Sequence, residues 1–215
     1  MERLDKLLVS KGYFSSREKA KEAIKRGLVL INGKVITKPS TKVDVNAEVK
    51  ILEGEKPRGY WKLRDLDKEW QIIKRGDVIL DLGSSAGGFL LYASERASFV
   101  YGVEYSEKFR EALEKIESER DNIKVFIADA FKLDIRKIDR DIDVILTDLT
   151  LKPKISFKAV KRFLPLLKKN GKILFITKVG LDKEVPNFEN EGLKVIAYKK
   201  SSSKKEEYYL LVKAN

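Results

Sequence analysis

The pattern of apolar positions divides the chain into a short first segment and a longer second segment. In residues 1–56, leucines recur at helical spacing over residues 4–8, and a second helix is predicted over residues 16–26. Residues 28–36 alternate around an Asn-Gly pair, which is typical of a tight β-hairpin, and residues 47–52 predict a further strand. The first segment is therefore expected to form a small α+β domain.

The second segment, residues 57–215, alternates apolar strands with amphipathic helices. Strands are expected at residues 77–83, 99–104, 123–129, 141–148 and 171–178, helices at 60–73, 86–96, 106–120 and 155–170, and a final hairpin at 193–199 and 207–213. Near-continuous apolar strands are typical of a buried parallel sheet. The order of elements predicts an α/β fold, a doubly wound sheet with helices on both faces.

The composition narrows the chemistry that the chain can perform. Lys and Arg number 45 against 33 Asp and Glu, and the formal net charge of +12 favours a polyanionic partner such as nucleic acid. Cys and His are absent, which excludes disulfides, thiolate nucleophiles, Cys- or His-based metal sites and imidazole acid–base chemistry. No apolar run approaches the roughly 20 residues of a membrane helix, and the first residues lack the apolar core of a secretory signal. We therefore expect a soluble, cytoplasmic protein with no membrane partner and no metal.

The chain is rich in Lys, Glu and Ile and poor in Met and Gln, a composition typical of proteins from hot habitats. Compositional drift explains this composition equally well.

Residues 1–56 resemble the alpha-L RNA-binding domain first described in the fourth protein of the small ribosomal subunit. The resemblance runs through RLDKLL, SSREKAKEAIKRGLVLINGKVI and TKPSTKV, where small, basic and turn residues follow in the family's order. It implies that the helix pair and the following loop dock on structured RNA, either ribosomal RNA or a ribosomal subunit. The candidate RNA contacts are Arg3, Ser16, Arg17, Lys19, Lys21, Lys25, Arg26, Lys34 and Lys38.

A glycine-rich turn follows the first strand of the second segment. In a doubly wound sheet, ligands bind beyond the carboxyl ends of the strands, where the strand order reverses. The G-x-G-x-x-G dinucleotide fingerprint would need glycine where Ser85 stands, whereas D-x-G-x-x-x-G, which begins at Asp81, is the pattern of S-adenosylmethionine-dependent methyltransferases. We therefore expect S-adenosylmethionine at this turn, where glycines allow close backbone approach. The candidate residues are Asp81, Gly83, Ser84, Ser85, Gly87, Gly88 and Phe89.

Two further acids end the next two strands. Glu104 ends the second strand, where α/β nucleotide sites place a carboxylate on ribose hydroxyls, and Asp129 ends the third, where it could reach an adenine amino group. Carboxylates gathered at one sheet edge repel one another unless a ligand uses them. Together with Asp81, these acids strengthen the prediction of a nucleoside-containing cofactor.

From Arg58 to Val212 the chain resembles the FtsJ family of RNA ribose 2′-O-methyltransferases. The stretches that carry the resemblance are RGYWKLRDLDKEWQIIKRGDVILDLGSSAGGF, DIDVILTDL, GKILFITK and EEYYLLV. The family uses a Lys-Asp-Lys-Glu tetrad, which corresponds here to Lys62, Asp148, Lys178 and Glu207, with Glu206 as the competing choice for the last member.

The residue types of this tetrad suit methyl transfer to a hydroxyl. A ribose hydroxyl must lose its proton as the new bond forms, so a general base is needed. A lysine can serve only with a lowered pKa, which partial burial and a second ammonium nearby would provide. We expect Lys178 to be the base, Lys62 and Asp148 to orient it, and Glu207 to complete the hydrogen-bond network.

An alpha-L domain followed by an FtsJ-like domain is the arrangement of the TlyA family, often labelled hemolysins, whose members methylate ribosomal RNA on cytidine riboses. RGYWKL resembles that family's R-G-G-x-K-L, although Tyr60 replaces the second glycine and residues 149–157 read LTLKPKISF rather than the family's usual run. The resemblance implies an RNA-docking domain at residues 1–56 and a Rossmann-like methyltransferase domain at residues 57–215.

The expected function is S-adenosylmethionine-dependent methylation of an RNA ribose 2′-hydroxyl, on ribosomal RNA. The alternatives are methylation of transfer RNA and a non-catalytic RNA-binding assembly factor. A pore-forming protein is disfavoured, since no long apolar or amphipathic segment supports it. The target nucleotide and the oligomeric state stay open.

Overall fold

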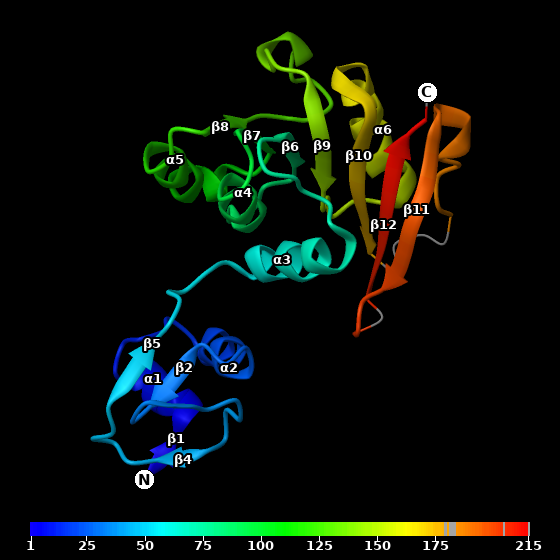
Figure 1. Cartoon of the computed structure of the whole chain (residues 1–215). Coiled ribbons are helices and arrows are strands. Elements are labelled where there is room, and N and C mark those ends of the chain that lie inside the picture. The colour runs from blue at the N-terminus through cyan, green and yellow to red at the C-terminus, as the bar shows by residue number, and fades with distance from the viewer. Residues whose placement is uncertain (179, 181–183, 204, 215) are drawn as a thin grey trace. The chain divides into compact units, whose positions relative to one another are not determined.

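The structure, a computed structural model, describes residues 1–178, 180, 184–203 and 205–214, and the chain divides into two compact units, Met1–Lys56 and Pro57–Asn215 (Figure 1). Each unit has its own secondary structure and its own buried side chains. In the described part of the chain, none of the helices combines the length and the apolar composition needed to cross a bilayer.

The first unit contains two helices and two small sheets. Its elements are β1 (Glu2–Arg3), α1 (Leu4–Ser10), α2 (Arg17–Lys25), β2 (Val29–Ile31), β3 (Lys34–Val35), β4 (Lys42–Val43) and β5 (Val49–Ile51). β2 and β3 form the predicted hairpin, in which Asn32 and Gly33 take left-handed backbone at φ of +48° and +75°, and β5 pairs with the other side of β2. The predicted elements are present, whereas the two-residue pair of β1 and β4 is too short to give a periodic signal.

The second unit is a seven-stranded sheet with helices on both faces. Its helices are α3 (Arg58–Trp70), α4 (Gly88–Ser94), α5 (Arg110–Ser118) and α6 (Pro153–Phe163), with short 3-10 turns at Glu107–Phe109, Ile135–Lys137, Leu164–Leu166 and Glu189–Glu191. Its strands are β6 (Val78–Leu82), β7 (Phe99–Glu104), β8 (Ile123–Ile127), β9 (Ile142–Thr147), β10 (Leu167–Lys178), β11 (Leu193–Lys200) and β12 (Glu206–Lys213). The predicted doubly wound α/β fold is confirmed.

The strand order places one reversal point at the centre of the sheet. The order is β11-β12-β10-β9-β6-β7-β8, parallel except for β12, which runs antiparallel to β10 and β11. From β6 the chain builds outward through β7 and β8, then returns to β9 on the other side of β6. In such sheets, ligands bind beyond the carboxyl ends of the two strands at the reversal, here β6 and β9.

The two faces of the sheet are covered by different helices. On one face, Leu80 and Leu82 of β6 join a buried apolar cluster with Phe157 of α6. Phe157, Phe175 and Phe188 meet there edge to face, with ring centroids 5.2–5.8 Å apart. On the opposite face, the absent side chain of Gly102 leaves room for Leu90 of α4.

One predicted helix is wrong at its carboxyl end. The pattern predicts a helix over residues 155–170, but α6 ends at Phe163 and a 3-10 turn leads into β10 at Leu167. Pro165 explains the early end, because proline lacks the backbone N–H that would extend the helix, and its ring clashes with the preceding turn. Residues 167–170 therefore belong to the strand that carries Lys178.

Candidate active site

The turn between β6 and α4, here called the glycine loop (residues 83–87), has an unusual backbone path. Gly83, Ser85 and Gly87 have positive φ of +89°, +50° and +79°. Glycine adopts this region freely, whereas a serine there is strained. The backbone N–H of Ser85 donates to Glu104 Oε2 at 2.8 Å, which helps to hold the strained conformation. Strained non-glycine residues of this kind cluster at ligand sites.

Packing is close at two glycines of the glycine loop and at Gly88 directly after it. A Cβ on Gly87 would overlap with Ile116 Cδ1. A Cβ on Gly83 would lie 2.8 Å from Leu149 Cδ2, in the segment that follows β9. A Cβ on Gly88 would lie 2.5 Å from the backbone nitrogen of Tyr60, so α3 and α4 approach backbone to backbone. Ser84 and Phe89 are buried and pack inside the unit.

Asp81 is a buried carboxylate without a hydrogen-bond partner. Its side chain is fully buried at the end of β6, and neither carboxylate oxygen has a partner among the described residues. Burial raises the pKa of Asp81 to about 7. Because a buried carboxylate without donors is costly, Asp81 is suited to receive a donor from a ligand, such as an ammonium group.

The other two strand-end acids shape the backbone beside them. Glu104 accepts from the backbone N–H of Ser85 at 2.8 Å and of Ser106 at 2.7 Å, and Asp129 Oδ1 accepts from the backbone N–H of Phe131 at 2.8 Å. Each carboxylate has acceptor capacity beyond these bonds, since an ionised carboxylate offers about four lone-pair sites.

Two exposed aromatic residues lie next to these acids and were not among the predicted site residues. Tyr105 follows Glu104 and is 77% exposed, and Phe131 lies two residues after Asp129 and is 37% exposed. Exposed aromatic rings beside two acids could bind the flat face of a base. The signal was available in the sequence, as aromatic residues directly after the two polar strand ends.

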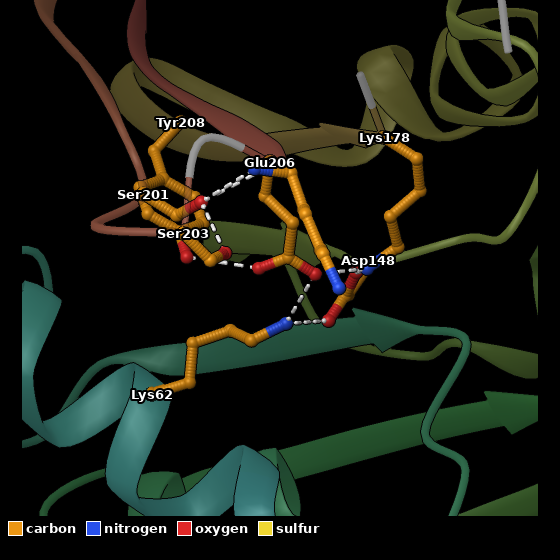
Figure 2. A network of polar contacts seen from close by, with 8 residues as sticks. Lys62, Asp148, Lys178, Ser201, Ser203, Glu206 and Tyr208 are labelled. Atoms are coloured by element: carbon orange, nitrogen blue, oxygen red, sulfur yellow. Dashed lines mark hydrogen bonds and ion pairs between the residues drawn. The ribbon is translucent and has the colours of Figure 1, made fainter. Parts of the chain in front are cut away.

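Four charged side chains meet where β9, β10, β12 and α3 come together (Figure 2). Lys62 Nζ donates to Asp148 Oδ2 at 2.6 Å and to Glu206 Oε1 at 3.0 Å. Lys178 Nζ donates to Asp148 Oδ1 at 2.7 Å and also to Glu206 Oε1. The four residues, here called the lysine–carboxylate cluster, alternate in sign, and their side chains are 15–24% exposed.

Glu206, not Glu207, belongs to the cluster. In the antiparallel pairing of β10 with β12, Lys178 lies opposite Glu206 and Thr177 opposite Glu207. Successive residues of a strand point to opposite faces, so Glu206 shares the face of Lys178 and Glu207 does not. Glu207 instead accepts from the hydroxyls of Tyr198 and Tyr209, each at 3.1 Å. The expectation that Glu207 completes the network is therefore wrong.

The electrostatic environment of Lys178 also differs from the expectation. Burial acts to lower its pKa, but the carboxylates of Asp148 and Glu206 outweigh burial and raise the pKa of Lys178 above its ordinary value. The same ion pairs hold the pKa of Glu206 low, at about 2, despite its burial. Lys178 is therefore a charged ammonium in the resting site, and the predicted lowering of its pKa by Lys62 is not found.

The candidate RNA contacts of the first unit differ in whether the structure gives their side chains a partner within that unit. Ser16 caps α2 by accepting from the backbone N–H of Lys19 at 3.4 Å, which gives it a structural role. Arg3 and Arg17 both pair with the buried carboxylate of Asp5, at 3.0 and 2.7 Å. Side chains with carboxylate partners within the unit are those of Arg3, Arg17, Lys19, Lys21 and Arg26. Lys25, Lys34 and Lys38 lie on the same unit, at the end of α2, in β3 and in the loop before β4.

Comparison with known proteins gives two family matches. The model described as S4 domain matches residues 2–49, and the model described as FtsJ-like methyltransferase matches residues 56–211. The resemblances drawn from the sequence are therefore confirmed.

Individual relatives are similar over parts of the chain. A Bacillus subtilis (strain 168) protein named "Putative rRNA methyltransferase YqxC" is 33% identical over 132 residues, which cover 57% of this chain and 47% of that protein. Ribosomal RNA large subunit methyltransferase E of Archaeoglobus fulgidus is 28% identical over 165 residues, 70% of this chain and 82% of the relative. The chain thus spans about half the length of the Bacillus subtilis protein.

A solved structure shares the fold. The structure named "Putative hemolysin", from Streptococcus thermophilus, matches with a TM-score of 0.61 at 21% identity and covers 100% of this chain and 89% of its own.

Proposed function

This chain belongs to the FtsJ-like methyltransferase family, and on that premise we propose that it transfers a methyl group from S-adenosylmethionine to a ribose 2′-hydroxyl of RNA. The observation that supports this most strongly is the lysine–carboxylate cluster. Its four residues come from segments that are distant in sequence and are in direct contact in the structure. They are Lys62 of α3, Asp148 directly after β9, Lys178 of β10 and Glu206 of β12.

The residues beside the glycine loop fit S-adenosylmethionine, the methyl donor of the FtsJ family. Asp81 lacks a donor for its buried carboxylate, which the ammonium of the methionine part could supply. Glu104 and Asp129 are acceptors for ribose hydroxyls and an adenine amino group, and Tyr105 and Phe131 offer apolar rings for the base. The positive φ of Gly83, Ser85 and Gly87 gives the glycine loop the bent backbone path that would lie against the ligand.

When bound, S-adenosylmethionine supplies an electrophilic methyl group on a positively charged sulfonium. The task of the chain is to orient the hydroxyl and remove its proton, since displacement at a methyl carbon depends chiefly on alignment. The neutral form of Lys178 accepts the proton, while Asp148 and Glu206 fix its Nζ by hydrogen bonds. Lys62 anchors both carboxylates from the other side.

The resting charge of Lys178 has a consequence for the pH dependence. Lys178 must release its own proton before it can accept another, and its two carboxylate partners raise the pKa that governs this release. Methyl transfer should therefore speed up as the pH rises through the neutral and mildly alkaline range.

The substrate that we propose is ribosomal RNA. The names of both relatives refer to rRNA methyltransferases. The S4 domain match and the formal net charge of +12 support an RNA partner, with the first unit as the docking unit and the second as the methyltransferase unit. This substrate implies a cytoplasmic site of action, where ribosomes are assembled.

The decisive experiment combines labelled cofactor with a set of RNAs. The full chain is incubated with methyl-labelled S-adenosylmethionine and with ribosomal subunits, naked ribosomal RNA and transfer RNA. We expect label in ribosomal RNA at one ribose, where the 2′-O-methyl group blocks alkaline cleavage of the adjacent phosphodiester. Asp148→Asn serves as the matched inactive control.

Each other outcome contradicts a defined part of the proposal. Label on a base would refute the ribose 2′-hydroxyl, and label confined to transfer RNA would refute the ribosomal substrate. RNA binding without any transfer would favour the non-catalytic assembly factor.

A further inference from the structure

The helix that carries Lys62 is joined to the helix that follows the glycine loop. At their amino-terminal ends, α3 and α4 touch through Gly59 and Gly88, since a Cβ on Gly88 would lie 2.8 Å from the Gly59 carbonyl carbon. Near this contact, Tyr60 of α3 also donates to Glu95, which directly follows α4, at 3.1 Å, so the amino-terminal end of α3 is well attached. An attachment farther along α3 fixes the direction of its carboxyl-terminal half.

Asp67 provides that second attachment near the other end of α3. It is 8% exposed, and its two oxygens have separate partners. Oδ2 accepts from the hydroxyl of Tyr92 in α4 at 2.8 Å, and Oδ1 accepts from the backbone N–H of Ile73 at 2.8 Å, which fixes the turn after α3. Neither residue belongs to the lysine–carboxylate cluster or to the glycine loop.

The surroundings of Tyr92 make this bond rigid. Tyr92 is 1% exposed, and its ring lies edge to face with Tyr60 at a centroid distance of 5.4 Å. The guanidinium of Arg96 lies 4.1 Å from the centre of the Tyr92 ring, and Tyr60 in turn donates to Glu95 at 3.1 Å. The Tyr92 ring is thus held on several sides, and its hydroxyl donates to Asp67.

We propose that the Asp67–Tyr92 hydrogen bond positions Lys62 relative to the glycine loop, and that both residues act on methyl transfer through Lys62. Lys62 lies between the two attachments, three residues after Gly59 and five before Asp67, so about 4.5 Å and 7.5 Å along the axis of α3. Without this bond, α3 keeps the glycine contact and the Tyr60–Glu95 hydrogen bonds, both at its amino-terminal end, and a long ion pair from Arg96 to Asp67 at 3.9 Å. The carboxyl-terminal half of α3 is then held less firmly, and its tilt displaces Lys62 Nζ from Asp148 and Glu206. The inference rests on the proposed function, since it concerns the rate of that reaction.

The size of the effect follows from how sharply transfer depends on alignment. A misplacement of about 1 Å costs roughly 100-fold in rate, and the tilt permitted here is smaller, so we expect Tyr92→Phe to lower kcat about tenfold. The KM for S-adenosylmethionine should stay nearly unchanged, because the residues beside the cofactor are not touched. Tyr92→Phe removes one hydroxyl and keeps the ring that packs against Tyr60.

Tyr101 offers a matched control within the same unit. It is also buried, at 2% exposed, and its hydroxyl also donates to a carboxylate, that of Asp139. Tyr101→Phe therefore removes a hydrogen bond of the same kind on the sheet face opposite α4. It should lower thermal stability as Tyr92→Phe does, while its kcat stays at the wild-type value.

The decisive measurement compares Tyr92→Phe in two backgrounds by single-turnover methylation well below the unfolding temperature. In the wild-type background the rate should fall about tenfold, and in the Lys62→Ala background it should not fall further, because the residue through which Tyr92 acts is gone. Lys62→Ala could leave no measurable rate. The test then compares the single variants Asp67→Asn and Tyr92→Phe with the variant that carries both substitutions. The double variant should then be no slower than the slower single variant.

Three outcomes would count against the inference, and one against the proposed function alone. An unchanged kcat in Tyr92→Phe, an equal loss in Tyr101→Phe, or a full tenfold loss in the Lys62→Ala background would each refute the positioning role. A wild-type chain that transfers no methyl group to any RNA would instead refute the proposed function.

Discussion

Replacing Asp81 by Asn should stabilise the second unit and weaken cofactor binding at the same time. The carboxylate of Asp81 is fully buried and has no partner among the described residues, and its pKa rises from 3.8 to about 7. Between pH 3.8 and about 7, Asp81 is therefore mostly protonated in the folded chain and mostly ionised in the unfolded chain. Stability contributed at this position is present at acidic pH and is lost as the pH rises from about 4 to 7.

The magnitude follows from the two pKa values. Each tenfold change in a protonation equilibrium is worth about 1.4 kcal/mol, so the ionised carboxylate costs up to about 4 kcal/mol above pH 7. Asparagine resembles the protonated acid in shape and never ionises, so Asp81→Asn should recover most of this cost at pH 8. At pH 5 the gain should be smaller, about 2 kcal/mol.

The assay is urea unfolding of the cofactor-free chain at pH 5 and pH 8, followed by tryptophan fluorescence. Both tryptophans, Trp61 and Trp70, lie in the second unit, so the signal reports on the unit that contains Asp81. Cofactor must be removed, because a bound ligand would add its own stabilisation. A gain that is equal at both pH values, or a loss at pH 8, would refute the argument that Asp81 is ionised without a partner.

Calorimetry on the same variant separates the functional role from the structural one. If Asp81 accepts a charge-assisted hydrogen bond from the cofactor, its loss should cost about 1.5–3 kcal/mol, or roughly 10- to 150-fold in affinity for S-adenosylmethionine. A variant that is more stable yet binds the cofactor as tightly as wild type would show that Asp81 does not contact it.

Further predictions concern the cluster, the helix contact and the first unit. Lys178→Ala and Lys178→Arg should both lower the rate of single-turnover methylation by orders of magnitude, with cofactor affinity nearly intact. The Arg variant fails because a guanidinium cannot accept a proton, and substantial activity in that variant would exclude Lys178 as the base. Glu206→Gln should lower kcat at least tenfold and Glu207→Gln should not, and the reverse order would overturn the assignment of the fourth residue. Gly88→Ala should destabilise the second unit by several kcal/mol in urea unfolding, because its Cβ would meet backbone atoms rather than a flexible side chain. Deleting residues 1–56 should weaken RNA binding and flatten its salt dependence while cofactor affinity, measured by calorimetry, stays the same.

The sequence was sufficient to predict the elements and the neighbourhood of the site. Strand and helix alternation predicted a doubly wound sheet, and the sheet order then brought Asp81, Glu104 and Asp148 to the carboxyl ends of β6, β7 and β9. These placements depend on local patterns of period 2 and 3.6, which a single sequence contains. The early end of α6 at Phe163 also had a local cause in Pro165, although the apolar pattern continued past it.

The fourth member of the cluster could not be predicted in the same way. Glu206 and Glu207 are identical residue types, adjacent in sequence and both in β12. Which of them faces Lys178 depends on the register of β12 against β10, and a shift of one residue exchanges the two faces. The register is fixed by tertiary packing of the whole strand, so no feature of the EEYY sequence distinguishes the two acids.

Charge states were the least predictable feature, because they depend on partners contributed by distant segments. Asp5 and Asp81 are both fully buried, yet hydrogen bonds from Arg3 and then Arg17 lower the pKa of Asp5 to about 2, while burial raises the pKa of Asp81 to about 7. The stability contributed by Asp5 is therefore present above about pH 4 and lost as the pH falls toward 2, the opposite of the behaviour of Asp81.

Asp5→Asn should accordingly destabilise the first unit at pH 8. Hydrogen exchange measures this effect, because the first unit contains no tryptophan. Opposite effects of the two Asp→Asn substitutions on stability would show that the missing partner of Asp81, rather than burial alone, marks Asp81 as a ligand site. If both substitutions stabilise the chain at pH 8, burial alone accounts for both aspartates.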